Sequence, residues 1–217
     1  IRPDVKLARK KGSQLPLVDS KKIGLAYGAF SPSTKGHAEL LKMAQKEGIS
    51  PENFIAAVSQ EGGTIDQNDP HSFRTALFPQ GFRKYLMQKT VPGANVIGAS
   101  QELFAGSIPR MFETSSSSGQ RRFIKAQQGS LAFVGSDKTE KDLEKYIRSG
   151  YDVRVGDRTT GISGTAAREA IDNLDSKSIA EIFTKGAVEV INQYLPQMKN
   201  RSNIFPEIIK RVNSKVD

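Results

Sequence analysis

The stretch Gly28-Ala29-Phe30-Ser31-Pro32-Ser33-Thr34-Lys35-Gly36-His37 lies between an apolar run and an amphipathic segment. The run Ile23 to Phe30 is typical of a buried strand, and apolar positions recur at helical spacing over residues 38–45. The stretch is therefore a turn from a strand into a helix. The first amides of a helix lack internal partners and carry the positive end of its dipole, so they can hold phosphate oxygens. Gly36 allows close approach, and His37 would lie beside the phosphate.

A second motif near the other end of the chain follows the same principle. It reads Gly161-Ile162-Ser163-Gly164-Thr165-Ala166-Ala167-Arg168. Ser163 or Thr165 can cap a helix that begins there. Arg168 would project from the first turns of that helix as a planar, permanently charged group suited to phosphate. Two helix N-termini would then face one polyphosphate.

Strand-like apolar runs alternate with helical patterns along the chain. These runs are Ile23 to Phe30, Phe54 to Ser59, Asn95 to Ala99, Leu131 to Gly135 and Tyr151 to Val155. The alternation predicts an α/β fold with a Rossmann-like, doubly wound, mainly parallel five-stranded sheet, helices on both faces and a helical C-terminal tail. Ligands of such sheets bind outside the carboxyl ends of the strands. Both motifs, and a loop at Gly135-Ser136-Asp137, lie at or beyond strand ends, so one crevice could collect them.

The two motifs resemble the (H/T)xGH and ISxTxxR motifs of a nucleotidyltransferase superfamily. It includes nicotinamide mononucleotide adenylyltransferases, phosphopantetheine adenylyltransferases and glycerol-phosphate cytidylyltransferases. The matching residues are Thr34-x-Gly36-His37 and Ile162-Ser163-Gly164-Thr165-x-x-Arg168. The run Leu131 to Lys138 is similar to the family's strand with its GxD loop. Thr34 stands where many members have His, which preserves the reaction class but removes a second imidazole.

The resemblance implies an enzyme that transfers a nucleotidyl group from a nucleoside triphosphate to a phosphorylated acceptor and releases pyrophosphate. ATP is the favoured triphosphate and nicotinamide mononucleotide the favoured acceptor, because the Ser-Gly-Thr-x-x-Arg form and a two-helix tail are closer to the nicotinamide mononucleotide enzymes. The run Arg158 to Ser163 is similar instead to a motif of cytidylyltransferases. A cytidylyltransferase acting on a polyol or sugar phosphate therefore remains an alternative.

The resemblance also implies the site residues. His37, Thr34 and Arg168 would be catalytic, and Mg²⁺ would be the cofactor, with no metal site formed by the protein itself. The residues expected to contact the nucleotide are Gly28, Ala29, Phe30, Gly36, Asp137, Ile162, Ser163, Gly164 and Thr165.

Five side chains keep two interpretations each. Asp137 could cap the following helix or accept a hydrogen bond from a ribose or acceptor hydroxyl. Arg74 and Arg83 are similar in position to an Arg-bearing helix of the family, although an exposed helix face is favoured for both. Phe104 or Phe112 could stack on a nicotinamide ring, although a core position is favoured for each.

Length and composition set the domain organisation. At 217 residues and 37% hydrophobic content, the chain can bury one sizeable core. We expect a basic arm over residues 1–20, a nucleotidyltransferase core over 21–175 with a mobile Ser-rich insert at about 111–130, and a helical extension over 176–217. The chain lacks Cys, which excludes disulfides and thiolate metal sites. No membrane-spanning run or secretory signal pattern is present, so we expect a cytoplasmic protein.

The formal net charge of +9 has more than one interpretation. The cations of the basic arm could contact nucleic acid or remain solvated, and a positive field would also steer an anionic nucleotide to its cleft. A non-catalytic nucleic-acid-binding or structural protein that retains the fold is therefore the second alternative. Homo-oligomerisation is open to a chain of this kind, and no membrane partner is expected.

Overall fold

The computed structural model describes residues 18–60, 78–99, 101–104, 106, 108–115, 121–156 and 162–199. The strands are β1 (Val18–Lys21), β2 (Gly24–Gly28), β3 (Phe54–Ser59), β4 (Asn95–Ala99), β5 (Met111–Ser115), β6 (Arg121–Ala126), β7 (Leu131–Gly135) and β8 (Asp152–Gly156). The helices are α1 (Lys35–Lys46), α3 (Gln80–Thr90), α4 (Glu140–Arg148), α5 (Gly164–Asp172), α6 (Ser176–Ile182) and α7 (Lys185–Lys199), with 3-10 turns η1 (Pro51–Asn53) and η2 (Gln101–Phe104). None of the helices in these ranges is long and apolar enough to cross a membrane.

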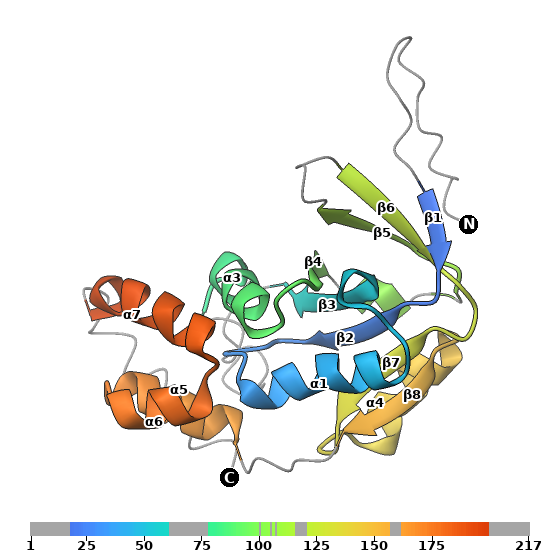
Figure 1. Cartoon of the computed structure of the whole chain (residues 1–217). Coiled ribbons are helices and arrows are strands. Elements are labelled where there is room, and N and C mark those ends of the chain that lie inside the picture. The colour runs from blue at the N-terminus through green and yellow to red at the C-terminus, as the bar shows by residue number, and fades with distance from the viewer. Residues whose placement is uncertain are drawn as a thin grey trace, which may run out of the picture.

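The main sheet has the strand order β4-β3-β2-β7-β8, and each neighbouring pair is parallel (Figure 1). The chain winds outward from β2 to β4, returns, and continues from β7 to β8 on the other side. The order therefore reverses between β2 and β7, which is the topological switch point where such sheets bind ligands. The predicted Rossmann-like fold is confirmed, because its five strands come from the five apolar runs.

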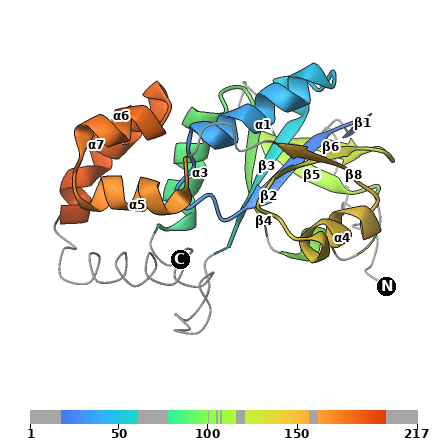
Figure 2. The same ribbon diagram turned by 90° about the horizontal axis from the view of Figure 1, so that it is seen from below.

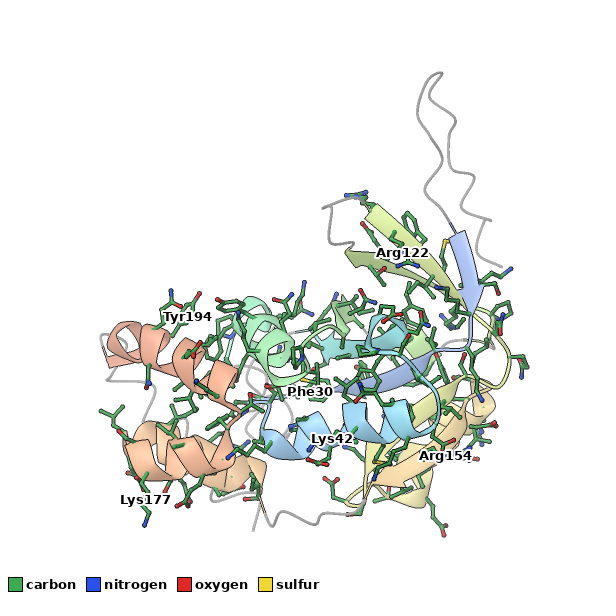
Figure 3. All side chains as sticks on the ribbon, in the orientation of Figure 1. Phe30, Lys42, Arg122, Arg154, Lys177 and Tyr194 are labelled. Atoms are coloured by element: carbon green, nitrogen blue, oxygen red, sulfur yellow. The ribbon has the colours of Figure 1, made fainter. Side chains whose placement is uncertain are left out.

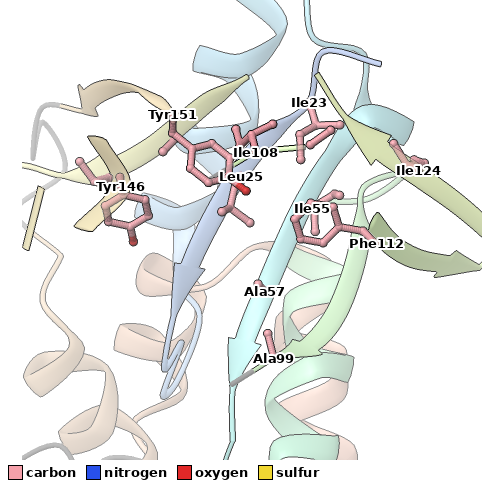
Figure 4. Close-up of a cluster of buried hydrophobic side chains, with 13 residues drawn as sticks. Ile23, Leu25, Ile55, Ala57, Ala99, Ile108, Phe112, Ile124, Tyr146 and Tyr151 are labelled. Carbon is pink, nitrogen blue, oxygen red and sulfur yellow. The ribbon is translucent and has the colours of Figure 1, made fainter. Parts of the chain in front are cut away.

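Two apolar layers cover the main sheet. Helices α1 and α3 pack on one face, where the buried cluster includes Ala26, Val58 and Phe133. Helix α4 covers the opposite face (Figure 2). There Leu25 and Ile55 belong to a cluster that also holds side chains of α4 and of a second sheet (Figure 4). Strands buried on both faces read as continuous apolar runs, which is why the sequence pattern identified them.

A third apolar cluster joins the C-terminal helices to α3. It contains Leu86 of α3, Phe78 two residues before that helix, and side chains of α5, α6 and α7 such as Ala167, Phe183 and Val190. The predicted helical tail is thus part of the packed structure. This packing sets the position of α5, which carries the second motif.

The second sheet corrects the expectation of a poorly packing insert at 111–130. It has the order β1-β6-β5, with β1 parallel and β5 antiparallel to β6. Phe112, Ile124 and Ala126 are buried against the main sheet. The polar content of this stretch obscured a period-two alternation that directs every second side chain to the core. The Ser-rich residues 116–120 lie outside the described residues.

Strand β1 also revises the expected boundary of the basic arm. Residues 18–21 pair with β6, so the arm drawn at 1–20 overlaps a strand, and residues 1–17 lie outside the described residues. We expect deletion of residues 1–17 to leave the melting temperature close to wild type. Deletion through Lys21 should lower it by several degrees, at about 2–4 °C per kcal/mol lost, because β6 loses its parallel partner. Calorimetry of the two truncations tests this, and equal melting temperatures would contradict it.

Candidate functional site

The site is formed around the loop between β2 and α1, which begins at the switch point. Pairing between β2 and β7 covers only Gly24↔Leu131 and Leu25↔Ala132, whereas β2 and β3 pair along the whole length of β2. The sheet is therefore least tightly paired toward the carboxyl ends of β2 and β7. A ligand laid across these ends would meet the loop on one side and the end of β7 on the other.

Phe30 holds an unusual backbone conformation in this loop. Its φ of 45° lies in the left-handed region, which a bulky residue rarely adopts and which is common at functional sites. The ring is buried, and a Cβ placed on Gly28 would lie 3.6 Å from it. The same ring meets the His37 imidazole edge-on, with centroids 5.1 Å apart and planes at 83°. Phe30 therefore fixes one side of the imidazole. Figure 3 labels Phe30 near the start of α1.

The start of α1 fixes the other side of His37. Thr34 is the N-cap, and its backbone N–H donates to Nδ1 of His37 at 2.9 Å. His37 thus takes the place of the Glu or Gln that usually closes a capping box. A ring nitrogen that accepts a hydrogen bond carries no proton, so the neutral imidazole holds its proton on Nε2. The local geometry makes His37 a donor on the side away from the cap.

Two buried arginines hold the backbone of the same loop. Arg168 of α5 is 3% exposed, and its Nη1 donates to the carbonyl oxygen of Ser31 at 3.0 Å. Arg83 of α3 is 0% exposed, and its Nη1 donates to the carbonyl oxygen of Ala29 at 2.7 Å. Helices α3 and α5 are therefore fastened to one loop by charge-assisted hydrogen bonds.

Arg83 is the residue whose role the sequence interpretation missed. The expectation of an exposed helix face is wrong for it, and Nε also donates to the carbonyl oxygen of Phe78 at 2.7 Å. A signal was available, because Arg83 shares helical spacing with the buried side chains of Leu86, Met87 and Thr90. Arg74 and His71 lie outside the described residues.

Ser33 adds a further tie between the loop and α3. The Thr90 hydroxyl donates to the carbonyl oxygen of Leu86 at 2.9 Å, so it must accept from the Ser33 hydroxyl, 3.0 Å away. Both side chains are buried. The loop is thus fixed at Ala29, Ser31 and Ser33 before its chain enters α1.

The second motif starts α5 as its chemistry predicts. Ser163 is the N-cap, and its hydroxyl accepts from the backbone N–H of Ala166 at 3.0 Å. Thr165 has the other role, since its hydroxyl accepts from Nη2 of Arg168 at 3.3 Å. A Cβ on Gly164 would lie 3.1 Å from Nη1 of Arg168, so this glycine gives the guanidinium room. Ile162 packs against the C-terminal core, and Gly161 lies outside the described residues.

Asp137 lies at the carboxyl end of β7 and does not cap the next helix. Thr139 caps α4 in a capping box with Asp142, so the capping interpretation of Asp137 is wrong. Hydrogen bonds from Thr139 lower the pKa of Asp142. A Cβ on Gly135 would lie 2.6 Å from Oδ1 of Asp137, which shows that the carboxylate folds back over the strand end. The side chain is exposed at this end of the sheet.

An aromatic group lies on the α4 face near β2. The Phe104 ring meets Tyr27 and Tyr146 edge-on at 5.1 and 4.8 Å, and the Lys145 ammonium lies 5.2 Å from its centroid. Burial lowers the pKa of Lys145 and raises that of Tyr27. Phe112 is only 3% exposed within the core, so the stacking role considered for it is wrong. Phe104 is partly exposed and remains a candidate.

The donor set suits a cation that arrives with phosphate. Within the described ranges, no three His, Asp or Glu side chains cluster to form a metal cage. Mg²⁺ in nucleotide sites is generally held by one or two carboxylates together with substrate phosphates. Asp137, a carboxylate at the end of β7, is of the type that this pattern requires.

Comparison with known proteins finds similarity only to solved structures. No protein-family model matches the chain, and no curated protein matches it. Thermotoga maritima TmcAL bound with alpha-thio ATP is 13% identical with a TM-score of 0.48, over 82% of this chain and 56% of that one. Plasmodium falciparum nicotinic acid mononucleotide adenylyltransferase complexed with NaAD is 12% identical with a TM-score of 0.37, over 81% of this chain and 96% of that one. At these identities and TM-scores, neither structure indicates what this chain binds.

Proposed function

We propose that the chain is a nucleotidyltransferase that uses a nucleoside triphosphate, with ATP favoured, and a phosphorylated acceptor. The observation that carries the proposal is the hydrogen bond from Arg168 to the carbonyl oxygen of Ser31. This bond joins α5 to the loop that precedes α1, across 137 residues of sequence. The N-terminus of each of these two helices is a candidate for binding phosphate. The resulting site combines an imidazole donor, a guanidinium and two helix N-termini at the switch point of the sheet.

The proposed reaction needs charge stabilisation more than a nucleophile from the protein. An oxygen of the acceptor phosphate attacks the α-phosphorus in line, and pyrophosphate leaves from the opposite side. Negative charge grows on the α-phosphoryl oxygens, where Nε2–H of His37 and the first amides of α1 would donate. Thr34 contributes by holding Nδ1. Because the acceptor supplies the nucleophile, no covalent enzyme intermediate is required.

The leaving pyrophosphate would be held from α5. The amides of its first turn point away from the helix, and Arg168 carries a fixed positive charge beside them. Ser163 and Thr165 position this end of the helix through the hydrogen bonds described above. Mg²⁺, when bound with the triphosphate, would neutralise charge on its phosphates. Asp137 would accept from a ribose or acceptor hydroxyl, or contact the cation.

The acceptor determines the specific activity, and we propose nicotinamide mononucleotide. The proposal rests on the Ser-Gly-Thr-x-x-Arg form of the second motif and on the two tail helices, which pack against α3 and α5. Phe104, which is partly exposed, is the aromatic side chain that we propose for stacking on a nicotinamide ring. A cytidylyltransferase acting on a polyol or sugar phosphate remains the alternative.

We expect ATP, nicotinamide mononucleotide and Mg²⁺ to yield NAD and pyrophosphate. The test incubates each of the four common triphosphates with nicotinamide mononucleotide, nicotinic acid mononucleotide, glycerol phosphate or a sugar phosphate, and measures pyrophosphate. The His37→Asn variant measures background from contaminating enzymes. Consumption of CTP with a polyol phosphate alone would keep the reaction class and replace the acceptor. If no pairing releases pyrophosphate, the enzyme proposal gives way to a binding protein.

A further inference from the structure

We propose that the outer face of the three-stranded sheet binds single-stranded nucleic acid. Strand β6 lies in the middle of this sheet, between β1 and β5. Ile124 and Ala126 point to the core, whereas Arg121 and Lys125 are exposed and Phe123 is partly exposed between them. The alternation of a strand therefore places one aromatic ring between two cations on the side away from the core.

The neighbouring strand extends the apolar part of this face. The register sets Met111 opposite Lys125 and Glu113 opposite Phe123. Met111 is 52% exposed. A sheet that buries one face normally presents polar side chains on the other, so a partly exposed aromatic ring on the central strand and an exposed thioether on the edge strand are features to explain. Exposed apolar groups rimmed by charge mark contact sites.

The charged side chains on the outer face of this sheet indicate which class of partner would bind there. On the outer face the described residues of β5 and β6 carry the cations Arg121 and Lys125 and the carboxylate Glu113, whereas Lys21 and Arg122 alternate to the other face and act on Glu52. Glu113 pairs with Arg121 at 3.1 Å, but both side chains are more than half exposed. An ion pair of this kind is worth little and exchanges readily for a phosphate contact. The excess of cations over carboxylates on this face favours a polyanionic partner.

Two physical arguments favour a single-stranded nucleic acid over other occupants. A second copy of the chain would bring like charges together, which is unfavourable. A single strand exposes the faces of its bases, so one base can stack on Phe123 while flanking phosphates meet Arg121 and Lys125. A duplex hides those faces in its stack. Base stacking on an aromatic ring tolerates any sequence, so weak sequence preference is expected.

This face is separate from the proposed catalytic site. Strand β1 leads into β2 at its amino end, whereas the loop with His37 follows the carboxyl end of β2. Figures 1 and 2 both place the three-stranded sheet on the side of the molecule away from α5, α6 and α7. Variants of this face should therefore leave nucleotidyl transfer unchanged.

The test measures anisotropy of labelled oligo(dT) and oligo(U), about 20 nucleotides long, and of a duplex of the same length, against the full chain. We expect the single strands to bind more tightly than the duplex. Phe123→Ala should weaken binding roughly tenfold or more, the size of one lost base stack. Phe123→Leu, which keeps an apolar side chain and guards against misfolding, should lose a similar amount. Exchanging both Arg121 and Lys125 for Gln should reduce the slope of log K against log salt by about 1.4.

Matched controls separate this face from general charge and hydrophobicity. Ile147→Ala removes a side chain that is 61% exposed on α4, and Lys177→Gln removes an exposed cation of α6. Both should bind oligonucleotides as wild type does. The proposal is overturned if the Phe123 variants bind like wild type, or if deletion of residues 1–17 alone abolishes binding. Binding to vesicles of anionic lipid without binding to oligonucleotides would overturn it as well.

Discussion

Replacing His37 with Asn should lower turnover by roughly 10²–10³-fold while triphosphate binding stays nearly intact. The amide oxygen of Asn can occupy the place of Nδ1 and accept the Thr34 N–H, so the start of α1 keeps its cap. What the variant lacks is the donor at the Nε2 position, which acts on charge that grows in the transition state. The expected size is that of one lost oxyanion donor. Single-turnover kinetics and calorimetric binding of a non-hydrolysable triphosphate measure the two quantities.

His37→Ala is the matched comparison, because it removes the cap contact and the donor together. It should show the same loss of turnover and an additional loss of stability of about 1 kcal/mol from the missing hydrogen bond. His37→Gln extends the series, since its amide nitrogen can reach the Nε2 position and restore part of the rate. A His37→Asn variant with wild-type turnover would remove the imidazole from the mechanism.

The fold and the start of each site helix could be predicted because their signals are local. Strands such as Phe54–Ser59 are buried on both faces and read as unbroken apolar runs. The hydroxyl of Ser163 accepts a hydrogen bond from the backbone N–H of Ala166, three residues later in the chain. The residues that determine the start of α5 therefore lie within one helical turn. Such features need no knowledge of the rest of the chain.

The features that the sequence interpretation missed depend on partners that lie far away in the chain. Arg83 is buried because α3 packs beside a loop more than fifty residues earlier, at Ala29. Strand β1 pairs with β6, which lies about a hundred residues later in the chain, so its short sequence carried no signal of a sheet. Thr139 and Asp142 have capping-box spacing, and this local signal could have decided between the two interpretations left open for Asp137.

Two buried guanidiniums, those of Arg83 and Arg168, converge on one loop and hold its backbone. Phe30 holds a left-handed conformation that costs about 1–3 kcal/mol, and such a conformation persists only where surrounding contacts determine it. The hydrogen bonds from Arg83 and Arg168 to the flanking carbonyl oxygens are contacts of this kind. Loss of either one should therefore disturb the orientation of the Phe30 ring and, through it, of His37.

Substitutions of Arg168 can separate the effect of its positive charge from the effect of the shape of its guanidinium. Its Nη1 and Nη2 serve two acceptors at once, the Ser31 carbonyl and the Thr165 hydroxyl, which a single ammonium cannot reproduce. Arg168→Ala should weaken triphosphate binding roughly 10- to 100-fold, because a charge-assisted hydrogen bond is worth about 1.5–3 kcal/mol. Arg168→Lys should recover only part of that loss, since it restores the charge without the fork.

The measurement must distinguish the loss of a triphosphate contact from the loss of the hydrogen bond by which Arg168 holds the loop. Arg168→Ala also leaves the Ser31 carbonyl without this donor, which should cost about 1–3 kcal/mol of stability. Arg83→Ala is the control, because it removes the other anchor of the loop, at Ala29, and leaves Arg168 in place, so stability should fall while triphosphate affinity changes much less. Calorimetric titration with triphosphate, done on variants shown to be folded by thermal melting, gives the three affinities. If Arg168→Ala and Arg168→Lys both bind triphosphate as wild type does, α5 is not the pyrophosphate-binding helix, and the guanidinium serves only to fasten the loop.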